Sequence, residues 1–397
     1  MLTTVANDFT MLAAPFLLIH STWRSRCNLG GSLSKVNRRG CRSDTRTSMS
    51  TTYDALLILS FGGPEGRKEV IPFLKNVLRG KSVPRERMLE VAEHYYHFDG
   101  KSPINGQNRE LIAALQKEFS EKGPELPIYW GNRNWHPLLA DTLRQMQKDG
   151  IQRALGFVTS AYSSYSSCRQ YLDDIAQARE EAGPGAPEVD KIRVFYNHPG
   201  FIEPLIENVG KALAQFPEDV RGQVPIVFTA HSVPLSMAET CRYVEQLEEA
   251  CRLVAAGVGR SGGTLVYQSR SGPPSQLWLE PDVFDHLRKL HATGVRNVVA
   301  MPIGFVSDHM EVLYDLDTEA QGLCRELGIR MVRAPAAGRH PKFVAMIREL
   351  VLERLGENQE RRFLGELGPR PDVCPADCCP GPRRPGVTQP GRPAIRS

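Results

Sequence analysis

The sequence predicts an α/β protein built from two similar doubly wound lobes, with a ligand-binding cleft between them. Short apolar runs end in Gly, Ser or Pro and are followed by segments with helical periodicity, as in parallel strands joined by crossover helices. Eight such runs fall into two groups of four, which a long helical stretch separates near residue 200. Polar and reactive residues follow several of these runs, where ligands of such sheets bind.

Each lobe is expected to be a Rossmann-like, four-stranded parallel sheet flanked by helices. The predicted strands of the first lobe are 55–63, 126–134, 154–162 and 192–197, and those of the second are 224–232, 263–272, 297–308 and 329–336. The two lobes are assigned to residues 49–200 and 201–360.

The two ends of the chain differ in composition from this body. Residues 1–48 are rich in Ser and Arg and lack periodicity, which favours a disordered leader or an over-extended gene start. A mitochondrial transit peptide is the alternative, because the segment is Arg-rich and poor in acids. Residues 361–397 are rich in Pro, Gly and Arg and are predicted to be a tail that buries no core of its own.

Composition excludes several classes of protein. No apolar run reaches the roughly 18 residues that suggest a transmembrane helix. The net charge of +4 arises at the ends, since residues 1–52 carry +5, residues 361–397 carry +4 and the body between them carries −5. No Lys/Arg cluster with interleaved aromatics indicates nucleic-acid binding. The nine cysteines are odd in number and scattered, which favours a reducing compartment.

A histidine and a carboxylate stand at predicted strand ends. His231 lies in the turn after the apolar part of its strand, and Glu311 opens a helix just past residues 297–308. Facing each other across a cleft, they would hold a divalent metal briefly or take a proton from a substrate. A structural role is the commoner one for a single histidine, so both interpretations stay open.

Glu311, Asp315 and Glu319 are spaced four residues apart. On an α-helix this spacing stacks the three carboxylates on one face, where they repel one another. Surrounding apolar residues favour a path for a cation or for protons. A solvated helix face is the alternative.

Two loops offer side chains that would bind a ligand or cap a helix, and the first combines hydroxyl and aromatic groups. Residues 159–171, which include Tyr162, would line a pocket for a flat ligand or cap a helix. Ser102, within residues 99–108, would cap a helix or meet a ligand carboxylate.

Three thiols cluster in the tail, at Cys374, Cys378 and Cys379. With a fourth ligand from the body they would bind zinc or an iron–sulfur cluster, whereas idle or oxidised thiols are the alternative. No G-x-G-x-x-G or G-K-[ST] motif occurs, which argues against a dinucleotide dehydrogenase or an NTPase. Two hypotheses remain: an enzyme that acts on a metal or a flat ring, and a non-catalytic two-lobed binding protein.

Seven blocks in the same order resemble the ferrochelatase family, from residue 53 to 355: "LLILSFGGPEG", "SPINGQN", "GNRNWHP", "TSAYSSYSSCRQY", "FTAHSVP", "YQSRSGP" and "GFVSDHMEVLYDLD". Members of this family insert ferrous iron into a porphyrin to complete haem. The resemblance implies the two-lobed chelatase architecture, with Fe²⁺ and a porphyrin as substrates.

The resemblance also implies roles for single residues. His231 would bind iron or accept pyrrole protons, Glu311 would be its partner, and Asp315 and Glu319 would continue an acidic path for iron or protons. Ser102 and Tyr162 match porphyrin-contacting positions. Phe61 stands where some bacterial members have a Tyr near the metal.

Within the family the chain looks most like actinobacterial members, which use coproporphyrin III. These hold a [2Fe–2S] cluster, here implied at Cys168, Cys374, Cys378 and Cys379. Cys241, Cys251 and Cys324 are then interpreted as ordinary buried residues. This implies a cytoplasmic enzyme that makes transient contact with neighbouring haem-pathway enzymes.

Animal-type members, which are mitochondrial, membrane-associated and use protoporphyrin IX, are the alternative. The sequence shows no evident apolar lip near the expected cleft, which favours the bacterial type. A non-catalytic tetrapyrrole-binding or metal-binding protein is the remoter alternative.

Overall fold

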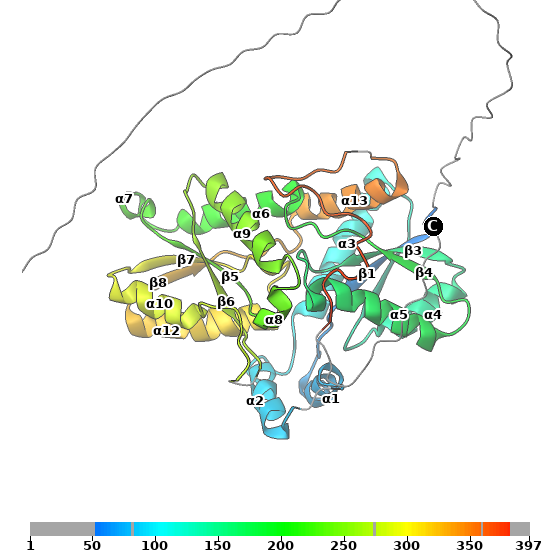
Figure 1. Cartoon of the computed structure of the whole chain (residues 1–397), viewed down its shortest axis with the longest axis horizontal. Helices are drawn as coiled ribbons and strands as arrows, with labels where there is room; N and C mark the ends of the chain where they lie inside the picture. Colours follow the sequence, from blue (N-terminus) through cyan, green and yellow to red (C-terminus); the bar gives the residue numbers. More distant parts are fainter. Residues whose placement is uncertain (1–51, 81–82, 273–274, 359, 382–397) are drawn as a thin grey trace, which may run out of the picture. The chain divides into compact units, whose positions relative to one another are not determined.

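The computed structural model describes residues 52–80, 83–272, 275–358 and 360–381. Residues Ser50–Ser397 form one compact unit, to which all of these belong (Figure 1). The expectation of a disordered leader at residues 1–48 lies outside the described residues.

The first sheet has strand order β2-β1-β3-β4, with every pair parallel. Its strands are β1 Ala55–Ser60, β2 Ile128–Asn132, β3 Arg153–Val158 and β4 Glu188–Lys191. The apolar run of β1 is buried along its whole length, because β1 lies inside the sheet with helices over the faces. The helical segments of this half are the 3₁₀ turn η1 Arg67–Glu69, α1 Val70–Val77, α2 Arg85–Tyr96, α3 Ile104–Lys122, α4 Leu139–Lys148, the π-helix η2 Tyr165–Arg169 and α5 Gln170–Ala182.

The second sheet repeats the same topology, in the order β6-β5-β7-β8. Its strands are β5 Ile226–His231, β6 Thr264–Gln268, β7 Asn297–Met301 and β8 Arg330–Arg333. The helical segments of this half are α6 Pro199–Leu213, α7 Glu218–Arg221, α8 Leu235–Ala238, α9 Tyr243–Gly257, α10 Val283–Ala292, α11 Met310–Val312, the π-helix η3 Leu313–Ala320, α12 Gln321–Leu327 and α13 Pro341–Leu355. The predicted pair of four-stranded parallel sheets is therefore confirmed.

The fourth strand is not the predicted one. The structure places β4 at Glu188–Lys191, a polar segment at the sheet edge, whereas residues 192–197 pair with no strand. That apolar run is buried all the same, because it leaves the sheet and enters the core shared by the two halves. A short apolar run signals burial, and burial alone does not distinguish a strand from a packed connection.

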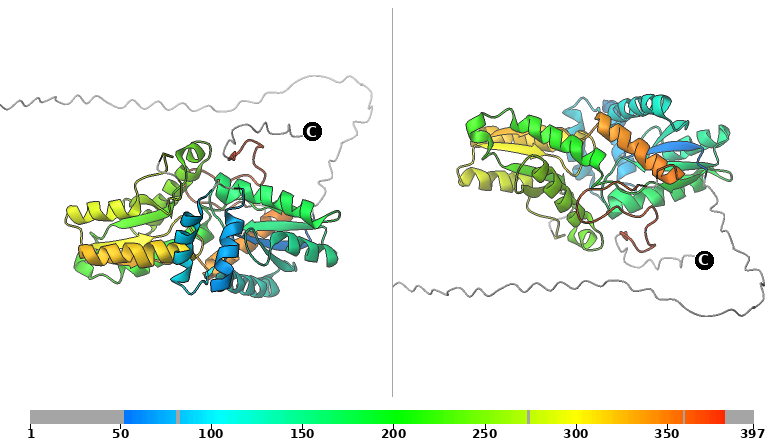
Figure 2. Two further views of the ribbon diagram at one scale, coloured as in Figure 1. Left: turned by 90° about the horizontal axis from the view of Figure 1, so that it is seen from below. Right: turned by 90° about the horizontal axis from the view of Figure 1, so that it is seen from above.

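The two halves share one core. Phe157 and Phe195 of the first half stack with ring centroids 5.1 Å apart, and both contact Phe343 of α13 edge to face. Phe201 of α6 completes the aromatic group. Helix α13 packs against α3 as well as α6, so the last helix returns to the first half, as the views in Figure 2 show.

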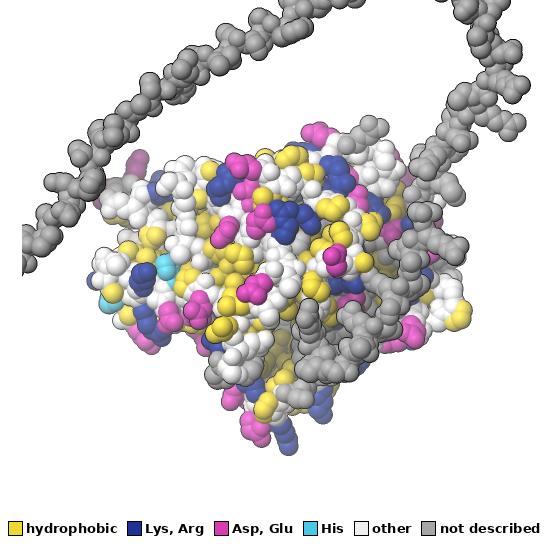
Figure 3. All heavy atoms as spheres, in the orientation of Figure 1, with side chains coloured by type: hydrophobic (Ala, Val, Ile, Leu, Met, Phe, Trp, Pro, Cys, Tyr) yellow, Lys and Arg dark blue, Asp and Glu magenta, His cyan; other side chains and the backbone are white. Residues whose placement is uncertain are grey.

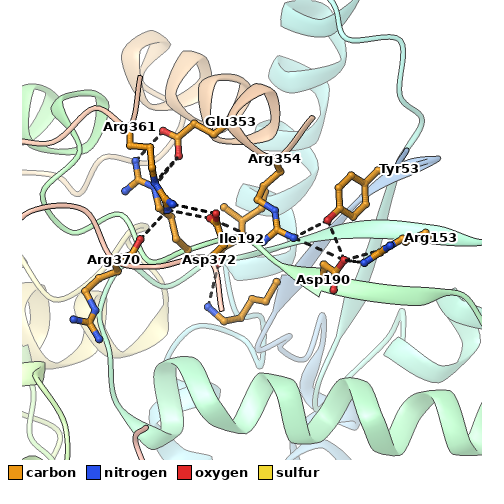
Figure 4. A network of polar contacts seen from close by, with 11 residues as sticks. Tyr53, Arg153, Asp190, Ile192, Glu353, Arg354, Arg361, Arg370 and Asp372 are labelled. Atoms are coloured by element: carbon orange, nitrogen blue, oxygen red, sulfur yellow. Dashed lines mark hydrogen bonds and ion pairs between the residues drawn. The ribbon is translucent and has the colours of Figure 1, made fainter. Parts of the chain in front are cut away.

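A polar network ties the tail to this body (Figure 4). Arg354 of α13 donates to the Tyr53 hydroxyl at 2.6 Å, and Tyr53 donates to Asp190 of β4 at 2.9 Å. Arg354 also lies 3.9 Å from Asp372 of the tail, which accepts two hydrogen bonds of 3.1 Å from Arg361. Residues 361–372 are thus held against α13 and the first sheet.

On the face shown in Figure 3, Lys and Arg side chains are interspersed with Asp and Glu rather than gathered in one basic field. Among the described residues, none of the helices combines the length and the apolar character that crossing a membrane requires.

Candidate active site

His231 is the last residue of β5, at the carboxyl end of a central strand. Its Nδ1 lies 2.5 Å from the carbonyl oxygen of Ser232. A carbonyl only accepts, so this contact places the ring proton on Nδ1 and leaves the lone pair on Nε2. The Tyr243 hydroxyl donates to the His231 carbonyl at 3.1 Å and fixes the backbone beneath the ring.

Glu311 lies in the first helical turn after β7. His309 caps this turn, since its Nδ1 accepts a hydrogen bond of 3.2 Å from the Glu311 backbone N–H. Burial lowers the pKa of His309, with His231 acting in the same direction and Glu311 opposing it. A neutral His309 keeps the acceptor that the cap needs. A role for His309 was not predicted, although a polar residue just before a helix start is a capping signal.

Asp308 anchors the same turn from two sides. Its carboxylate pairs with Arg333 of β8 at 2.9 Å, and its carbonyl accepts a hydrogen bond of 2.8 Å from Gln107 of α3. The second contact crosses from the first half to the second. Glu311 is thereby attached to both halves of the molecule.

His231 and Glu311 come together as predicted. His231 Nε2 lies 3.8 Å from Glu311 Oε2, and the side chains are 34% and 43% exposed. One metal ion could bind both atoms, because two ligand atoms that each lie about 2.1 Å from a metal ion can be 3.8 Å apart. The pair offers two acceptors that face each other, so it is suited to a proton or a divalent cation.

The acidic line continues on η3, which is a π-helix and not the predicted α-helix. Segments of this rare type occur often at functional sites. Asp315 is 9% exposed, and burial raises its pKa to about 7, with Glu311 and Glu319 adding to the rise. Burial also raises the pKa of Glu319, whose neighbour Asp282 acts in the same direction. Glu311, in the turn before the π-helix, and Glu319, within it, are thus both electrostatic neighbours of Asp315.

Two predicted porphyrin-contacting residues are packed into the first half. Ser102 is buried, and its backbone N–H donates to the Pro64 carbonyl at 2.8 Å. Phe61 packs edge to face on Phe73 of α1 at 6.2 Å. Their contact with a porphyrin stays a prediction.

Tyr162 is almost fully buried in the shared core. Its hydroxyl donates to the Ile303 carbonyl at 2.7 Å and so links the two halves. The hydroxyl is therefore committed to the protein, and a porphyrin contact through this residue also stays a prediction.

Helix α2 reaches from the first half to the acidic line. The ring of His94 stacks on Tyr314 of η3, with centroids 3.9 Å apart and planes 12° from parallel. His97 meets the same ring edge to face at 6.1 Å. The sequence offered no signal for this contact, because the partners lie in different halves.

An open groove of about 500 Å³ is lined by residues of α1, of α2 and of the segment between them. Its wall includes Val83 and Leu89, which are 38% and 41% exposed, beside Lys75 and Arg85. Two exposed apolar side chains thus lie here, one on α2 and one on the segment before it. His231 and Glu311 do not line this groove.

The tail cysteines lie against the segment that carries Cys168. Arg169 of η2 donates to the Ala376 carbonyl at 2.9 Å, which holds the tail loop on η2. Cys378 Sγ and Cys379 Sγ are 3.5 Å apart. Burial raises the pKa of Cys374 and of Cys379, and Cys378 and Cys168 raise both further, so all four thiols are neighbours.

The spacing of these thiols can be compared with the spacing of thiolates on a metal ion, and a bound cluster stays a prediction. Among the described residues, no three His, Cys, Asp or Glu side chains converge as ligands of one metal ion. A [2Fe–2S] cluster takes two thiolates on each iron. Two thiolates on one tetrahedral metal lie roughly 3.8 Å apart, since each lies about 2.3 Å from it. The 3.5 Å between Cys378 and Cys379 is near this value.

The other cysteines differ in their surroundings. Cys251 and Cys324 are buried in the two cores, as expected. Cys241 is only partly buried, and both Cys378 and Cys379 are among its electrostatic neighbours. It lies at the edge of the thiol group, which the sequence did not indicate.

Comparisons with known proteins identify the family of this chain. Residues 53–355 match the family model described as "Ferrochelatase". A protein of Rhodopirellula baltica named "Ferrochelatase" is 62% identical over 343 residues, which cover 86% of this chain and 97% of that protein. A protein of Streptomyces coelicolor named "Coproporphyrin III ferrochelatase" is 50% identical, with coverage of 83% of this chain and 94% of its own.

A solved structure of the sirohydrochlorin chelatase SirB from Bacillus subtilis subspecies spizizenii, in complex with cobalt, has a TM-score of 0.45. The two sequences are 11% identical, and the structural match covers 79% of this chain and 99% of the SirB chain. The family model matches residues 53–355, which is most of the chain, and the Rhodopirellula baltica relative is 62% identical. These two findings show that this chain belongs to the ferrochelatase family of lyases, which insert iron into porphyrins.

Proposed function

We propose that this ferrochelatase inserts Fe²⁺ into coproporphyrin III to give Fe-coproporphyrin III, also called coprohaem, and releases two protons. The observation that carries the chemistry is the pair of facing acceptors, His231 Nε2 and Glu311 Oε2, 3.8 Å apart. The substrate is supported by relatives named "Coproporphyrin III ferrochelatase", which are 46–50% identical to this chain.

The reaction exchanges two N–H bonds for bonds to iron, without oxidation or reduction. His231 accepts a pyrrole proton on Nε2, because its Nδ1 is occupied by the Ser232 carbonyl. Glu311 stabilises the resulting imidazolium or the arriving Fe²⁺. The acidic line serves both Fe²⁺ and the second proton: with a pKa of about 7, Asp315 can accept that proton, release it to solvent and bind the next Fe²⁺ at neutral pH.

We also propose that Cys168, Cys374, Cys378 and Cys379 hold a [2Fe–2S] cluster. When bound, such a cluster supplies a one-electron redox couple. The chain's own contribution is the anchoring of the tail: Arg169 holds the loop at Ala376, and Cys378 N–H closes a turn on the Pro375 carbonyl at 3.0 Å. Burial and the neighbouring thiols raise the pKa of Cys374 and of Cys379, so ligation of iron by these two residues would release their protons.

The proposed setting is the cytoplasm. The relatives named above are bacterial, and all seven cysteines among the described residues are free thiols, as in a reducing compartment. Fractionation of the host cell tests this setting.

The deciding experiment is an anaerobic assay of the purified protein with Fe²⁺ and either coproporphyrin III or protoporphyrin IX. Loss of free-porphyrin fluorescence reports insertion. Faster loss with coproporphyrin III supports the proposal. Preference for protoporphyrin IX would retain the enzyme and replace its substrate, and loss with neither would contradict the proposed function.

A further inference from the structure

Gln268 connects the histidine strand to the acidic line. It ends β6, pairs in register with His231 of β5, and its carbonyl accepts a hydrogen bond of 2.8 Å from Ser232 N–H. Its side chain is 1% exposed. The Nε2 group donates to Asp315 Oδ2 at 3.1 Å and to the Glu311 carbonyl at 3.3 Å. The buried amide of Gln268 thus binds the side chain of Asp315 and the backbone of Glu311.

Ser269 adds a second bond to the same oxygen. Its hydroxyl donates to Asp315 Oδ2 in a short hydrogen bond. The backbone of Ser269 has φ +62°, in the left-handed region that non-glycine residues seldom adopt. Residues held in such conformations cluster at functional sites.

We propose that Gln268 and Ser269 are positioning residues for iron delivery: they fix the orientation of the Asp315 carboxylate so that it hands Fe²⁺ toward Glu311 and His231. Both donors reach Oδ2, so the carboxylate cannot rotate without losing two hydrogen bonds. This inference rests on the proposed iron insertion. Its rival is a purely structural role, in which the same bonds only attach η3 to β6.

Ser269→Gly is the sharpest variant. Glycine adopts the left-handed conformation without strain, so the substitution removes the hydroxyl and preserves the backbone. Gln268→Leu is the second variant, because it removes the amide donor at similar volume. Asp99→Gly is the matched control: Asp99 also has a left-handed φ, of +53°, but it is highly exposed and its carboxylate lies 3.8 Å from Arg67.

The experiment measures kcat/KM for Fe²⁺ and the KM for the porphyrin in the full chain, alone and in an Asp315→Asn background. Loss of one hydrogen bond to a charged group should lower kcat/KM for Fe²⁺ about tenfold. The porphyrin KM should change less than about twofold, since neither donor is assigned to the ring. Circular dichroism verifies that each variant is folded.

The double variants show whether the donors act through Asp315, and the comparison of the Fe²⁺ and porphyrin parameters distinguishes positioning from a structural role. If the donors act through Asp315, Ser269→Gly should have no further effect once Asp315 is Asn. Equal losses in both backgrounds, or an unchanged kcat/KM for Fe²⁺ in Ser269→Gly and Gln268→Leu, would overturn the inference and leave iron insertion intact. A wild-type protein that inserts no iron would remove the proposed function and this inference with it.

Discussion

His231 Nε2 and Glu311 Oε2 face each other at 3.8 Å although their residues lie far apart in the sequence. The reason is topological: β5 and β7 are neighbouring parallel strands, so the residues that follow their carboxyl ends meet at one edge of the sheet.

Replacing His231 by Ala should lower kcat for iron insertion about 10²- to 10⁴-fold, because the proton acceptor is lost. Glu311→Gln should lower it as well, since the amide cannot balance the imidazolium charge. Steady-state rates from porphyrin fluorescence give the comparison. His291→Ala, on the outer helix α10, is the control that should keep full activity. Wild-type turnover in the folded His231→Ala protein would contradict the assignment.

Asp315 should make the protein less stable as the pH rises from about 4 to about 7. Burial raises its pKa from 3.8 to about 7, so the native state holds a proton that the unfolded chain has already released in this range. The stabilisation is complete below the unfolded pKa and is lost as the pH passes the folded value. Asp315→Asn should remove this pH dependence, which changes the free energy of unfolding by on the order of 2–4 kcal/mol.

Thermal unfolding of both proteins at pH 5 and pH 8 tests this point. The difference in Tm between Asp315→Asn and the wild type should favour the variant more at pH 8 than at pH 5. An equal difference at both pH values would show that Asp315 does not titrate in this range.

Cys374→Ser should abolish the visible absorption of the proposed cluster, because a hydroxyl is a poor ligand for iron in place of a thiolate. Cys241→Ser is the matched control, since Cys241 neighbours the same thiols without belonging to the proposed ligand set. Anaerobic purification followed by absorption spectra and iron and sulfide analysis provides the measurement. A full cluster in Cys374→Ser would exclude the tail as its ligand, and loss in Cys241→Ser would revise the set.

Arg354→Met should destabilise the protein by about 2 kcal/mol, because the partly buried Asp190 and Asp372 each lose one of their Arg partners and the Tyr53 hydroxyl loses its donor. The Arg354 side chain is 12% exposed and contacts Tyr53, Asp190 and Asp372. Arg288→Met removes an exposed pair with Asp285 and should change the free energy of unfolding by less than about 0.5 kcal/mol.

Urea unfolding followed by circular dichroism measures both Arg variants. Because Arg354 contacts the tail residue Asp372, its loss should also lower cluster content. Equal stability of the Arg354→Met and Arg288→Met proteins would show that the network in Figure 4 contributes little.

The pattern of apolar and turn-forming residues along the chain predicted most of the strands and the turns that follow them. The apolar run of β1 and the turn after β5 placed a strand and His231 correctly, because burial and chain reversal leave direct marks on residue type. Seven of the eight predicted strands are present. The eighth failed at residues 192–197, where an apolar run is buried in a core shared between the halves and not in a sheet.

The amino-acid sequence by itself determined the two parallel sheets, the family, and the presence of His231 and Glu311 at strand ends. The tertiary structure alone decided the π-helical form of the acidic line, the bonds from Gln268 and Ser269 to Asp315, the burial of Tyr162, and the place of Cys241 beside the tail thiols. These features depend on contacts between segments distant in the chain. Periodicity reports the environment of one segment, whereas the partners of a side chain are set by how all segments pack.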